Sequence, residues 1–237
     1  SYAGVNEKTG ESQWWVDKKD AEGNMVREKT TDYNNATRYL CGDAIADVYG
    51  GFTTSFDFYG VDISANFTYQ IGGKVYNANV MHSMMGDKDT GLGYNRLAEV
   101  SECWKMFNVN SSGDIYAVTD PTELAALNAN AKYALPYSEY GIVNSEFIED
   151  ASFLRLQTLT IGYTFPKSII KYVGVSNIRV YFTGGNLFCI KGYSGLDPDV
   201  NVSPSADSSY SGFPTPNYDF RSYPKSRTFT FGLNVTF

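Results

Sequence analysis

The stretch VDISANFTYQI, residues Val61 to Ile71, alternates apolar and polar side chains without a break. Its odd positions are apolar or aromatic, and its even positions are Asp, Ser, Asn, Thr and Gln. Because successive side chains of a β-strand point to opposite faces, this period of two predicts a strand with one apolar and one polar face. Such a strand, at about 3.3 Å per residue and tilted by about 40°, spans roughly 28 Å, which matches the hydrocarbon core of a bilayer.

Four other stretches repeat the alternation, and the sequence therefore predicts five strands. They are expected at about residues 50–58, 61–72, 153–165, 178–188 and 227–237. The apolar faces carry no charge, whereas the opposite faces carry Asp57, Asp62 and Arg179. A lipid-facing outside and a hydrated lumen explain this division, so we expect these three charged residues to face the lumen of a barrel.

The connections between the strands are alternately short and long. Tyr59-Gly60 alone joins the first two strands as a tight hairpin, and residues 166–177 indicate a short helix closed by Gly174. The other two connections run from Gly72 to Ser152 and from Cys189 to Ser226. Long loops are uncommon in compact soluble domains, but outer-membrane barrels have short periplasmic turns and long extracellular loops. The predicted fold is all-β, a transmembrane antiparallel β-barrel with long extracellular loops.

Two short helices are expected inside the first long connection. Leu97, Val100, Trp104 and Phe107 recur at helical spacing, and the segment that begins at Asp120 resembles a capping box opening a helix that runs to residue 131. Both are interpreted as ordered structure within the loop.

Five spanning strands cannot close a barrel, because outer-membrane barrels have at least about 8 strands and an open edge in lipid leaves backbone groups unsatisfied. The chain is therefore interpreted as a piece of a larger barrel. The alternative is a soluble secreted β-sandwich, whose apolar faces turn toward each other and whose aromatic loops bind carbohydrate. Dependence on detergent or lipid distinguishes the two.

Composition excludes several classes of protein. Aromatic residues make up 16% of the chain, enough apolar surface to exclude a disordered protein. With 19 basic against 26 acidic residues, nucleic acid is not an expected partner. No run of about 18 apolar residues is present, which excludes a membrane-spanning helix. His82 is the single histidine, so a site with several histidines is impossible, and we predict no metal and no cofactor.

The acidic pairs Glu149-Asp150 and Asp197-Pro198-Asp199 could suggest paired catalytic carboxylates, but such groups in turns usually cap or face solvent. No catalytic residue is predicted, and the chain is not expected to be an enzyme. The turn at residues 86–91 could hold calcium but lacks the full set of acidic ligands. Free thiols are favoured over a disulfide between Cys41 and Cys103.

Aromatic residues punctuate the second long connection, and aromatic faces stack well on sugar rings. We expect some of them to contact a bound substrate or a partner protein, namely Tyr193, Tyr210, Phe213 and Tyr218. Phe237 ends the last alternating strand. A terminal aromatic residue on such a strand resembles the signal read by the outer-membrane assembly machinery, although it could also belong only to the aromatic girdle.

Several longer strings resemble SusC/RagA-type TonB-linked outer-membrane proteins, the TonB-dependent transporters. The most specific are FIEDASFLRLQTLTIGYTFPKSIIKYVGVSNIRVYFTGGNLF (residues 147–188), YSGLDPDVN (193–201) and YPKSRTFTFGLNVTF (223–237). YAGVNEKTGE (2–11) and the segment at residues 47–77 are also similar to this family. The resemblance covers nearly all of the chain and is weakest between about residues 78 and 145.

The resemblance implies that residues 1–237 form the C-terminal part of a 22-stranded barrel, without the plug domain and TonB box. It implies uptake of oligosaccharides or peptides in the outer membrane of a Gram-negative, Bacteroidetes-type bacterium. Its partners would be a SusD-like surface lipoprotein, TonB (through the missing N-terminal region) and outer-membrane lipid. In such proteins the SusD-like lipoprotein sits as a lid on the barrel, and the loop that contains Trp104 faces this lid and the cargo. The resemblance therefore makes Trp104 a further candidate contact and implies that the loop aromatics named above contact the cargo or the lid. Most of that loop departs from the family's pattern, so the substrate class is not transferred.

Overall fold

The computed structural model describes residues 1–85, 97–134, 145–172, 174–200 and 217–237. The chain folds as two compact units. The first unit contains Ser1–Cys41 and Asn77–Ile148, and the second contains Gly42–Tyr76 and Glu149–Phe237. No helix in the described ranges is long and apolar enough to cross a membrane.

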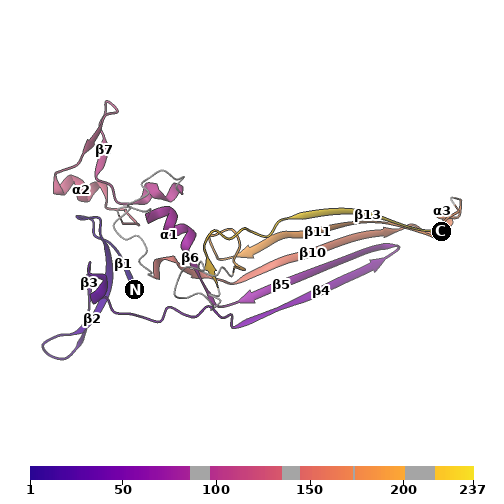
Figure 1. The fold of residues 1–237 in the computed structure, drawn as a ribbon, viewed down its shortest axis with the longest axis horizontal. Coiled ribbons are helices and arrows are strands. Elements are labelled where there is room, and N and C mark those ends of the chain that lie inside the picture. The colour runs from indigo at the N-terminus through magenta and orange to yellow at the C-terminus, as the bar shows by residue number, and fades with distance from the viewer. Residues whose placement is uncertain (86–96, 135–144, 173, 201–216) are drawn as a thin grey trace, which may run out of the picture. The chain divides into compact units, whose positions relative to one another are not determined.

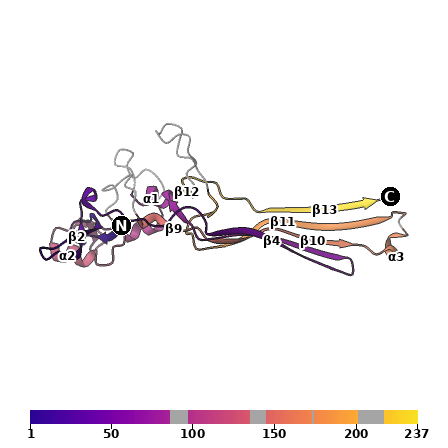
Figure 2. The ribbon, with the colours of Figure 1, turned by 90° about the horizontal axis from the view of Figure 1, so that it is seen from below.

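A five-stranded antiparallel sheet dominates the second unit (Figure 1), with the strand order β13-β11-β10-β5-β4. The strands are β4 (Val48–Phe58), β5 (Val61–Ile71), β10 (Phe153–Thr164), β11 (Asn177–Lys191) and β13 (Thr228–Thr236). Each lies within a few residues of a strand expected from the alternation, and β11 extends furthest beyond its expected end. Figure 2 shows the same strands as a single curved layer. The predicted all-β fold is confirmed.

The two short connections have distinct physical causes. Tyr59 and Gly60 both adopt positive φ angles, 47° and 86°. Positive φ at both central residues is the signature of a type I′ turn, whose twist matches that of the flanking strands. The second connection begins at Pro166 and contains the one-turn helix α3 (Lys167–Ile170), and Gly174 follows with a φ of 73°. The predicted hairpin and short helix are both present.

Strand register sorts the side chains into two faces. Phe52 lies opposite Phe67, Ile63 opposite Ile161, and Phe182 opposite Phe231, so the apolar stripes of all five strands coincide. This face stays open: Phe231, for example, is 80% exposed. The other large exposed side chains on it include Phe52, Phe56, Phe58, Ile161, Val180, Phe229, Leu233 and Val235. A β-sandwich would bury such a face against a second sheet.

Short segments of the two long connections form a small three-stranded sheet with the order β12-β6-β9. Its strands are β6 (Lys74–Asn77), β9 (Ile148–Asp150) and β12 (Tyr218–Asp219). The buried apolar cluster of the second unit combines Val75, Ala151, Tyr193 and Val200. These residues come from three distant parts of the sequence, so the cluster joins the loops to one another.

The first unit is built from short elements that the alternation did not predict. Its first sheet has the order β1-β2-β3, with strands Tyr2–Val5, Ser12–Lys19 and Met25–Thr30, and the 3₁₀ helix η1 (Tyr33–Asn35) follows. Later come α1 (Ala78–Met85), η2 (Ala98–Glu102), the hairpin β7 (Phe107–Val109) and β8 (Ile115–Ala117), α2 (Pro121–Leu127) and η3 (Ser145–Phe147).

The expected helix through Leu97 and Phe107 is wrong. Only the 3₁₀ helix η2 forms there, and Phe107 begins a strand, because the backbone N–H of Trp104 bonds the carbonyl of Tyr133 instead of continuing a helix. The second expected helix does begin where the capping box places it: Asp120 accepts the N–H groups of Thr122 and Glu123. This helix, α2, ends at Leu127, earlier than expected.

Candidate functional site

The polar face of the five-stranded sheet carries an ion pair that crosses a strand. Arg179 on β11 donates Nη2–H to Asp62 Oδ2 at 2.5 Å and Nε–H to Oδ1 at 3.0 Å, with β10 between the two residues. Gly162 of β10 lies at the crossing, where a Cβ atom would come within 2.4 Å of Arg179 Nη2. A glycine is required because both side chains lie flat across its backbone.

Tyr181 extends this polar band toward β13. The guanidinium of Arg179 lies 5.1 Å from the centre of the Tyr181 ring, in cation–π contact. The ring in turn covers Gly232 on β13, where a Cβ atom would meet it at 2.1 Å. Asp57 on β4 stands opposite Asp62 in the register. The three charged residues expected in the lumen therefore share one face of the sheet: Asp57 and Asp62 lie on adjacent strands, and Arg179 reaches Asp62 across β10.

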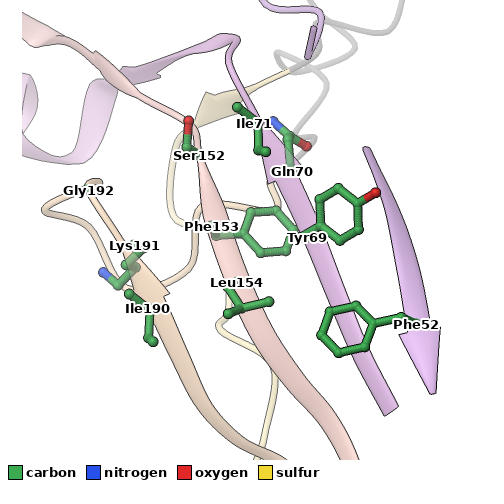
Figure 3. A pocket seen from close by; sticks show the side chains of 10 residues that line it. All are labelled: Phe52, Tyr69, Gln70, Ile71, Ser152, Phe153, Leu154, Ile190, Lys191 and Gly192. Atoms are coloured by element: carbon green, nitrogen blue, oxygen red, sulfur yellow. The ribbon is translucent and has the colours of Figure 1, made fainter. Parts of the chain in front are cut away.

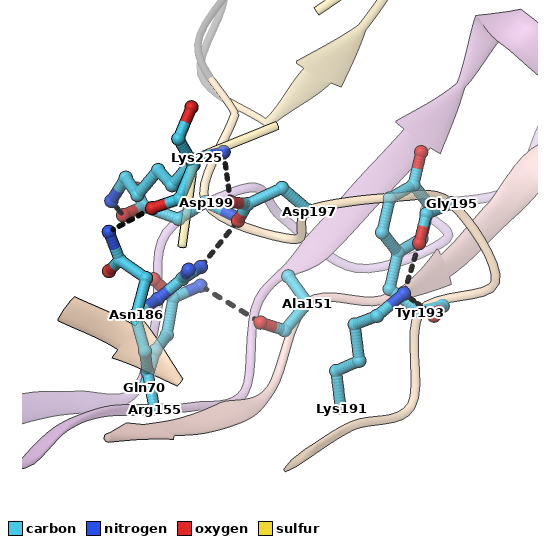
Figure 4. A network of polar contacts seen from close by, with 11 residues as sticks. Gln70, Ala151, Arg155, Asn186, Lys191, Tyr193, Gly195, Asp197, Asp199 and Lys225 are labelled. Carbon is cyan, nitrogen blue, oxygen red and sulfur yellow. Dashed lines mark hydrogen bonds and ion pairs between the residues drawn. The ribbon is translucent and has the colours of Figure 1, made fainter. Parts of the chain in front are cut away.

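A second polar cluster joins strands β10 and β11 to the β11–β13 connection (Figure 4). We call it the loop clasp, and its members are Arg155, Lys191, Tyr193, Asp197, Asp199, Asp219 and Lys225. At its centre Arg155 of β10 donates Nη2–H to Asp197 Oδ1 at 2.5 Å. Both side chains are buried, at 6% and 7% exposure. Asp197 also accepts the backbone N–H of Asp199 at 3.0 Å and that of Lys225 at 3.3 Å. One carboxylate therefore holds both ends of the connection against the strand.

Burial pushes the pKa of Asp197 upward, but the hydrogen bonds from Arg155 and the two backbone N–H groups outweigh it and hold that pKa below its usual value. The carboxylate is therefore charged at neutral pH. A more exposed ion pair between Lys225 and Asp199 reinforces the clasp. The clasp therefore has a structural role, because the carboxylates of Asp197 and Asp199 already accept hydrogen bonds or pair with basic side chains of the chain itself.

Tyr193 forms the other half of the clasp. Its hydroxyl donates to Asp219 Oδ2 at 2.6 Å, and its ring covers Gly195. Burial, and then the hydrogen bond to the Asp219 carboxylate, raise the pKa of Tyr193 far above its ordinary value. Lys191 donates Nζ–H to the carbonyl oxygens of Tyr193 and Gly195. The phenol is neutral and fixed, as a packing residue requires.

The five candidate contact aromatics divide into three groups. Trp104 is buried, donates Nε1–H to the Glu7 carbonyl at 2.8 Å and packs against Gly10. Tyr193 is buried in the clasp. Tyr218 is half-buried and stacks on Tyr76 with ring centres 5.6 Å apart. Tyr210 and Phe213 lie outside the described residues. The burial of Trp104 and Tyr193 favours packing over direct contact with a ligand.

The apolar face of the sheet contains an open groove of about 470 Å³ (Figure 3). Phe52, Tyr69, Ile71, Leu154 and Ile190 supply most of its apolar wall. Selective ligand sites combine an apolar wall with a few convergent polar groups. Here the Lys191 ammonium is instead directed to backbone carbonyls of the clasp. The groove suits non-specific contact with acyl chains.

The acidic pair, the candidate calcium turn and the cysteines that the sequence singled out show no catalytic or metal site in the described residues. Glu149 accepts the N–H and the hydroxyl of Ser194 at 2.7 and 2.8 Å, and Asp150 accepts the N–H and hydroxyl of Ser152 at 3.0 and 2.7 Å. The turn at residues 86–91 lies outside the described ranges. Across those ranges no three His, Cys, Asp or Glu residues gather as metal ligands. Cys41, Cys103 and Cys189 are free thiols.

Sequence reasoning missed Arg155, the residue that organises the clasp. The available signal was a single charged residue inside the strand Phe153–Thr164 together with the acidic LDPD segment. Nothing in the sequence pairs them, because 42 positions separate Arg155 from Asp197.

Phe237 follows β13 directly and is almost fully exposed. The structure gives it no packing role within the described part of the chain. Its function as an assembly signal stays a prediction.

Comparison with known proteins gives a consistent set of similarities, although no family model matches the chain. TonB-dependent receptor P3 of Formosa agariphila is 27% identical over 206 residues, which are 87% of this chain and 18% of the receptor. TonB-dependent receptor SusC of Bacteroides thetaiotaomicron is 34% identical over 137 residues, 55% of this chain and 11% of SusC.

Among solved structures, the RagAB peptide importer in its closed-closed state superposes with a TM-score of 0.68 at 24% identity. Its open-open state gives 0.62 at 20%. Each match covers all of this chain and 22% of the RagAB chain. The chain thus matches between about a tenth and about a fifth of the length of these relatives. The resemblance to SusC/RagA-type TonB-dependent transporters is confirmed, for one part of such a protein.

Proposed function

We propose that this chain is the C-terminal part of the barrel wall of a SusC-like, TonB-dependent outer-membrane transporter. The transporter would import oligosaccharides or peptides together with a SusD-like surface lipoprotein. The observation that carries the proposal is the five-stranded sheet, which has an uncharged apolar face exposed along its whole width and a polar face opposite. Sequence similarity to TonB-dependent receptors over 87% of the chain supports it.

A bilayer explains why the sheet leaves its apolar face open. In water, contiguous apolar patches of this size are rare on a monomer, whereas a lipid-facing wall requires one. The two outer strands of the sheet, β4 and β13, need partners in hydrocarbon, because unpaired backbone groups there cost several kcal/mol each. The rest of the barrel, carried by the full-length protein, would supply those partners.

The polar face would line the lumen. The Asp62–Arg179 pair and the Tyr181 ring lie flat over glycines of the neighbouring strands and project little from the sheet. A plug domain or a hydrated cargo path would lie against this side of the wall. Asp57 would be the free charge of this band. No catalytic role is proposed for any of these groups, and import would be driven through TonB.

The cargo class stays open between two possibilities. SusC and receptor P3 are TonB-dependent receptors whose names state no cargo, and RagAB is a peptide importer. We propose that Tyr210, Phe213 and Tyr218 contact cargo or the lipoprotein. Trp104 and Tyr193 would act indirectly, by holding the loops that carry such contacts.

The alternative, a soluble β-sandwich that binds carbohydrate, is not favoured. It would require the face that contains Phe56 and Phe231 to be buried against a second sheet, and both side chains are exposed. The fold of RagAB, a barrel transporter, also matches this chain over its whole length, which favours the barrel over the sandwich.

The test uses the full-length protein in its own cells. We expect it in the outer-membrane fraction, extractable only with detergent, co-purifying with a SusD-like lipoprotein and supporting uptake that disappears when TonB is deleted. Recovery of the protein in the soluble fraction, or uptake that persists without TonB, would contradict the proposal.

Orientation provides a second test. Protease added to intact cells should cut within the long connections and spare the short turns at residues 59–60 and 166–177. Cleavage at Lys167 or Lys171 in sealed cells would contradict this topology.

A further inference from the structure

Strands β10 and β11, with the connection between them, carry charge of one sign only. From residue 151 to residue 196 the sequence contains no acidic residue. The same segment contains five basic residues, namely Arg155, Lys167, Lys171, Arg179 and Lys191. The chain as a whole has a net charge of -7. A basic segment within an acidic chain points to an anionic partner for that segment.

Two of these five basic groups have no partner of their own. Arg155 and Arg179 are in ion pairs, and Lys191 donates to backbone carbonyls of the clasp. Within the described residues no ion pair involves Lys167 or Lys171, and both side chains are exposed. Lys171 Nζ lies only 5.0 Å from the centre of the Tyr172 ring. The two ammonium groups of the β10–β11 connection are therefore available to an anion.

Hydrogen bonds and packing hold the β10–β11 connection in place. Ile170 of α3 is 3% exposed, so the one-turn helix is anchored by its apolar side. Ser176 donates its N–H and its hydroxyl to the Thr236 carbonyl at 2.7 and 2.9 Å. Thr164 N–H donates to the Gly60 carbonyl at 2.7 Å and ties the connection to the β4–β5 turn. Figure 1 shows α3 and that turn at the same end of the sheet, which we call the turn rim.

Exposed apolar and aromatic side chains accompany the two lysines at the turn rim. Tyr172 is 82% exposed and Ile169 is 55% exposed, and Tyr59 of the neighbouring turn is 87% exposed. Tyrosine rings lie at the level of the headgroups where a protein crosses the surface of a membrane. Lysine side chains at that level lay their methylene groups along apolar surface and direct the ammonium group to the polar headgroups. The turn rim has both features.

The apolar face of the sheet contains a second groove, of about 390 Å³, close to the turn rim. Val61, Tyr163 and Val180 lie side by side in the register and line the groove at its end nearest the rim. Tyr163 precedes Pro166 by three positions, so the groove begins roughly 10 Å from the connection at about 3.3 Å per residue. The other apolar side chains of its wall are Ile161, Phe182 and Phe231.

The combination of this groove with two unpaired lysines restricts the ligand. An inorganic anion would pair with the lysines but would leave the groove empty. A zwitterionic phospholipid would fill the groove, but its own cationic group would be repelled by the lysines. A phospholipid with a net negative headgroup satisfies both parts, because its phosphate and its acyl chains belong to one molecule. The groove in Figure 3 lacks this combination, since Lys191 beside it is directed to the clasp.

We propose that the turn rim of β10 and β11 binds an anionic phospholipid. Lys167 and Lys171 hold its phosphate, and one acyl chain lies in the groove lined by Tyr163 and Val180. This inference rests on the proposed function, which places the sheet in a bilayer and the β10–β11 connection at the periplasmic surface. It goes further by assigning a lipid site with headgroup selectivity to one end of the barrel wall.

The first experiment uses the full-length transporter in nanodiscs of phosphatidylcholine. A small fraction of the lipid is phosphatidylglycerol with a photoreactive acyl chain, and mass spectrometry of chymotryptic peptides measures the labelling of β10 and β11. Lys167→Gln/Lys171→Gln should lower this labelling about tenfold or more, because each lysine near an anionic headgroup contributes several-fold to binding. Lys167→Arg/Lys171→Arg should keep it, because the charge remains.

Two controls accompany this experiment. Lys8→Gln/Lys19→Gln removes the same charge from exposed positions of the first unit and should leave the labelling unchanged. Phosphatidylcholine with the same photoreactive chain should label the wild-type β10 and β11 as weakly as phosphatidylglycerol labels the Gln variant. Heat-modifiable gel migration checks that all variants are folded. Equal labelling by the two lipids, or unchanged labelling of the Gln variant, overturns the proposal.

The second experiment places a photo-crosslinking residue at position 172 in intact cells. An adduct with an anionic phospholipid supports the proposal. A crosslink to a periplasmic protein instead of a lipid overturns it, and so does the absence of any adduct.

Failure of the lipid site and failure of the proposed function give different results. If the wild-type transporter inserts into nanodiscs and both photoreactive lipids label it equally, only the lipid site is overturned. If the full-length protein stays soluble without detergent and does not enter nanodiscs, the proposed function fails and the lipid site fails with it.

Discussion

Replacing Asp197 by alanine should open the β11–β13 connection while leaving the sheet intact. Asp197 holds together three segments of the clasp, since it accepts hydrogen bonds from Arg155 on β10, from its own loop and from the N–H of Lys225 just before β13. The variant removes all three bonds. It also leaves the guanidinium of Arg155 buried without a counter-charge, and Arg155 Nε already has no bonding partner in the described structure.

The size of the effect follows from the burial of the pair. Removing one partner of a buried ion pair costs about 3–5 kcal/mol. At about 1.4 kcal/mol per tenfold change, the equilibrium constant for local opening should rise by roughly 10²- to 10³-fold or more. Asp199→Ala is the matched control, because its ion pair with Lys225 is 46–49% exposed and such pairs contribute about 1 kcal/mol at most.

Native-state proteolysis of the full-length transporter in detergent measures this opening. When closing is faster than cleavage, the cleavage rate follows the population of the open form. Trypsin should therefore cut after Lys191, Arg221 or Lys225 much faster in Asp197→Ala than in Asp199→Ala, with cleavage outside the clasp unchanged.

A double variant tests the physical cause. In Arg155→Met/Asp197→Ala the buried charge is gone, so the connection should be better protected than in Asp197→Ala alone. If the two single Asp variants open equally, or if the double variant is the most open of all, the reasoning from a stranded buried charge is refuted.

Three further outcomes are expected. Gly162→Ala should destabilise the barrel by about 1–3 kcal/mol, because its Cβ would collide with the Asp62–Arg179 ion pair, and it should lower the folded fraction measured by heat-modifiable gel migration. Gly192→Ala is the control and should leave the folded fraction unchanged, because its Cβ would stand 3.7 Å from its nearest neighbour. The lowered pKa of Asp197 gives a stabilisation that is complete above its unfolded-state pKa of about 3.9 and lost as pH falls further, so hydrogen exchange in the clasp should accelerate only below about pH 4. Deleting Phe237 should reduce membrane insertion more than Phe229→Leu does, and equal outer-membrane levels would make it a girdle residue only.

The alternation in the sequence was enough to predict the sheet. Its period of two fixes which side chains share a face, and a shift of one residue would exchange the faces, so register follows from the need to keep one face apolar. The Tyr59-Gly60 turn was predictable for a similar local reason, because only two residues separate the alternating stretches and so short a connection selects a hairpin. The alternation within each strand and the hairpin turn depend only on neighbours in the chain.

The loops required the tertiary structure. Leu97, Val100 and Trp104 have helical spacing, yet the backbone of Trp104 bonds to Tyr133 and its ring bonds to the Glu7 carbonyl. A helix of that length is marginal alone, so distant contacts decide whether it forms.

Burial of individual residues was also decided by the fold. The sequence shows that Tyr193 is aromatic and that Asp197 lies in an acidic turn, and from this an exposed contact and a solvated carboxylate are reasonable expectations. The fold instead brings Arg155 and Asp197 together across 42 positions and covers both. Strand faces are set by the geometry of consecutive residues, whereas burial and ion pairing are set by which remote segments the chain packs against them, and local pattern carries no information about that choice.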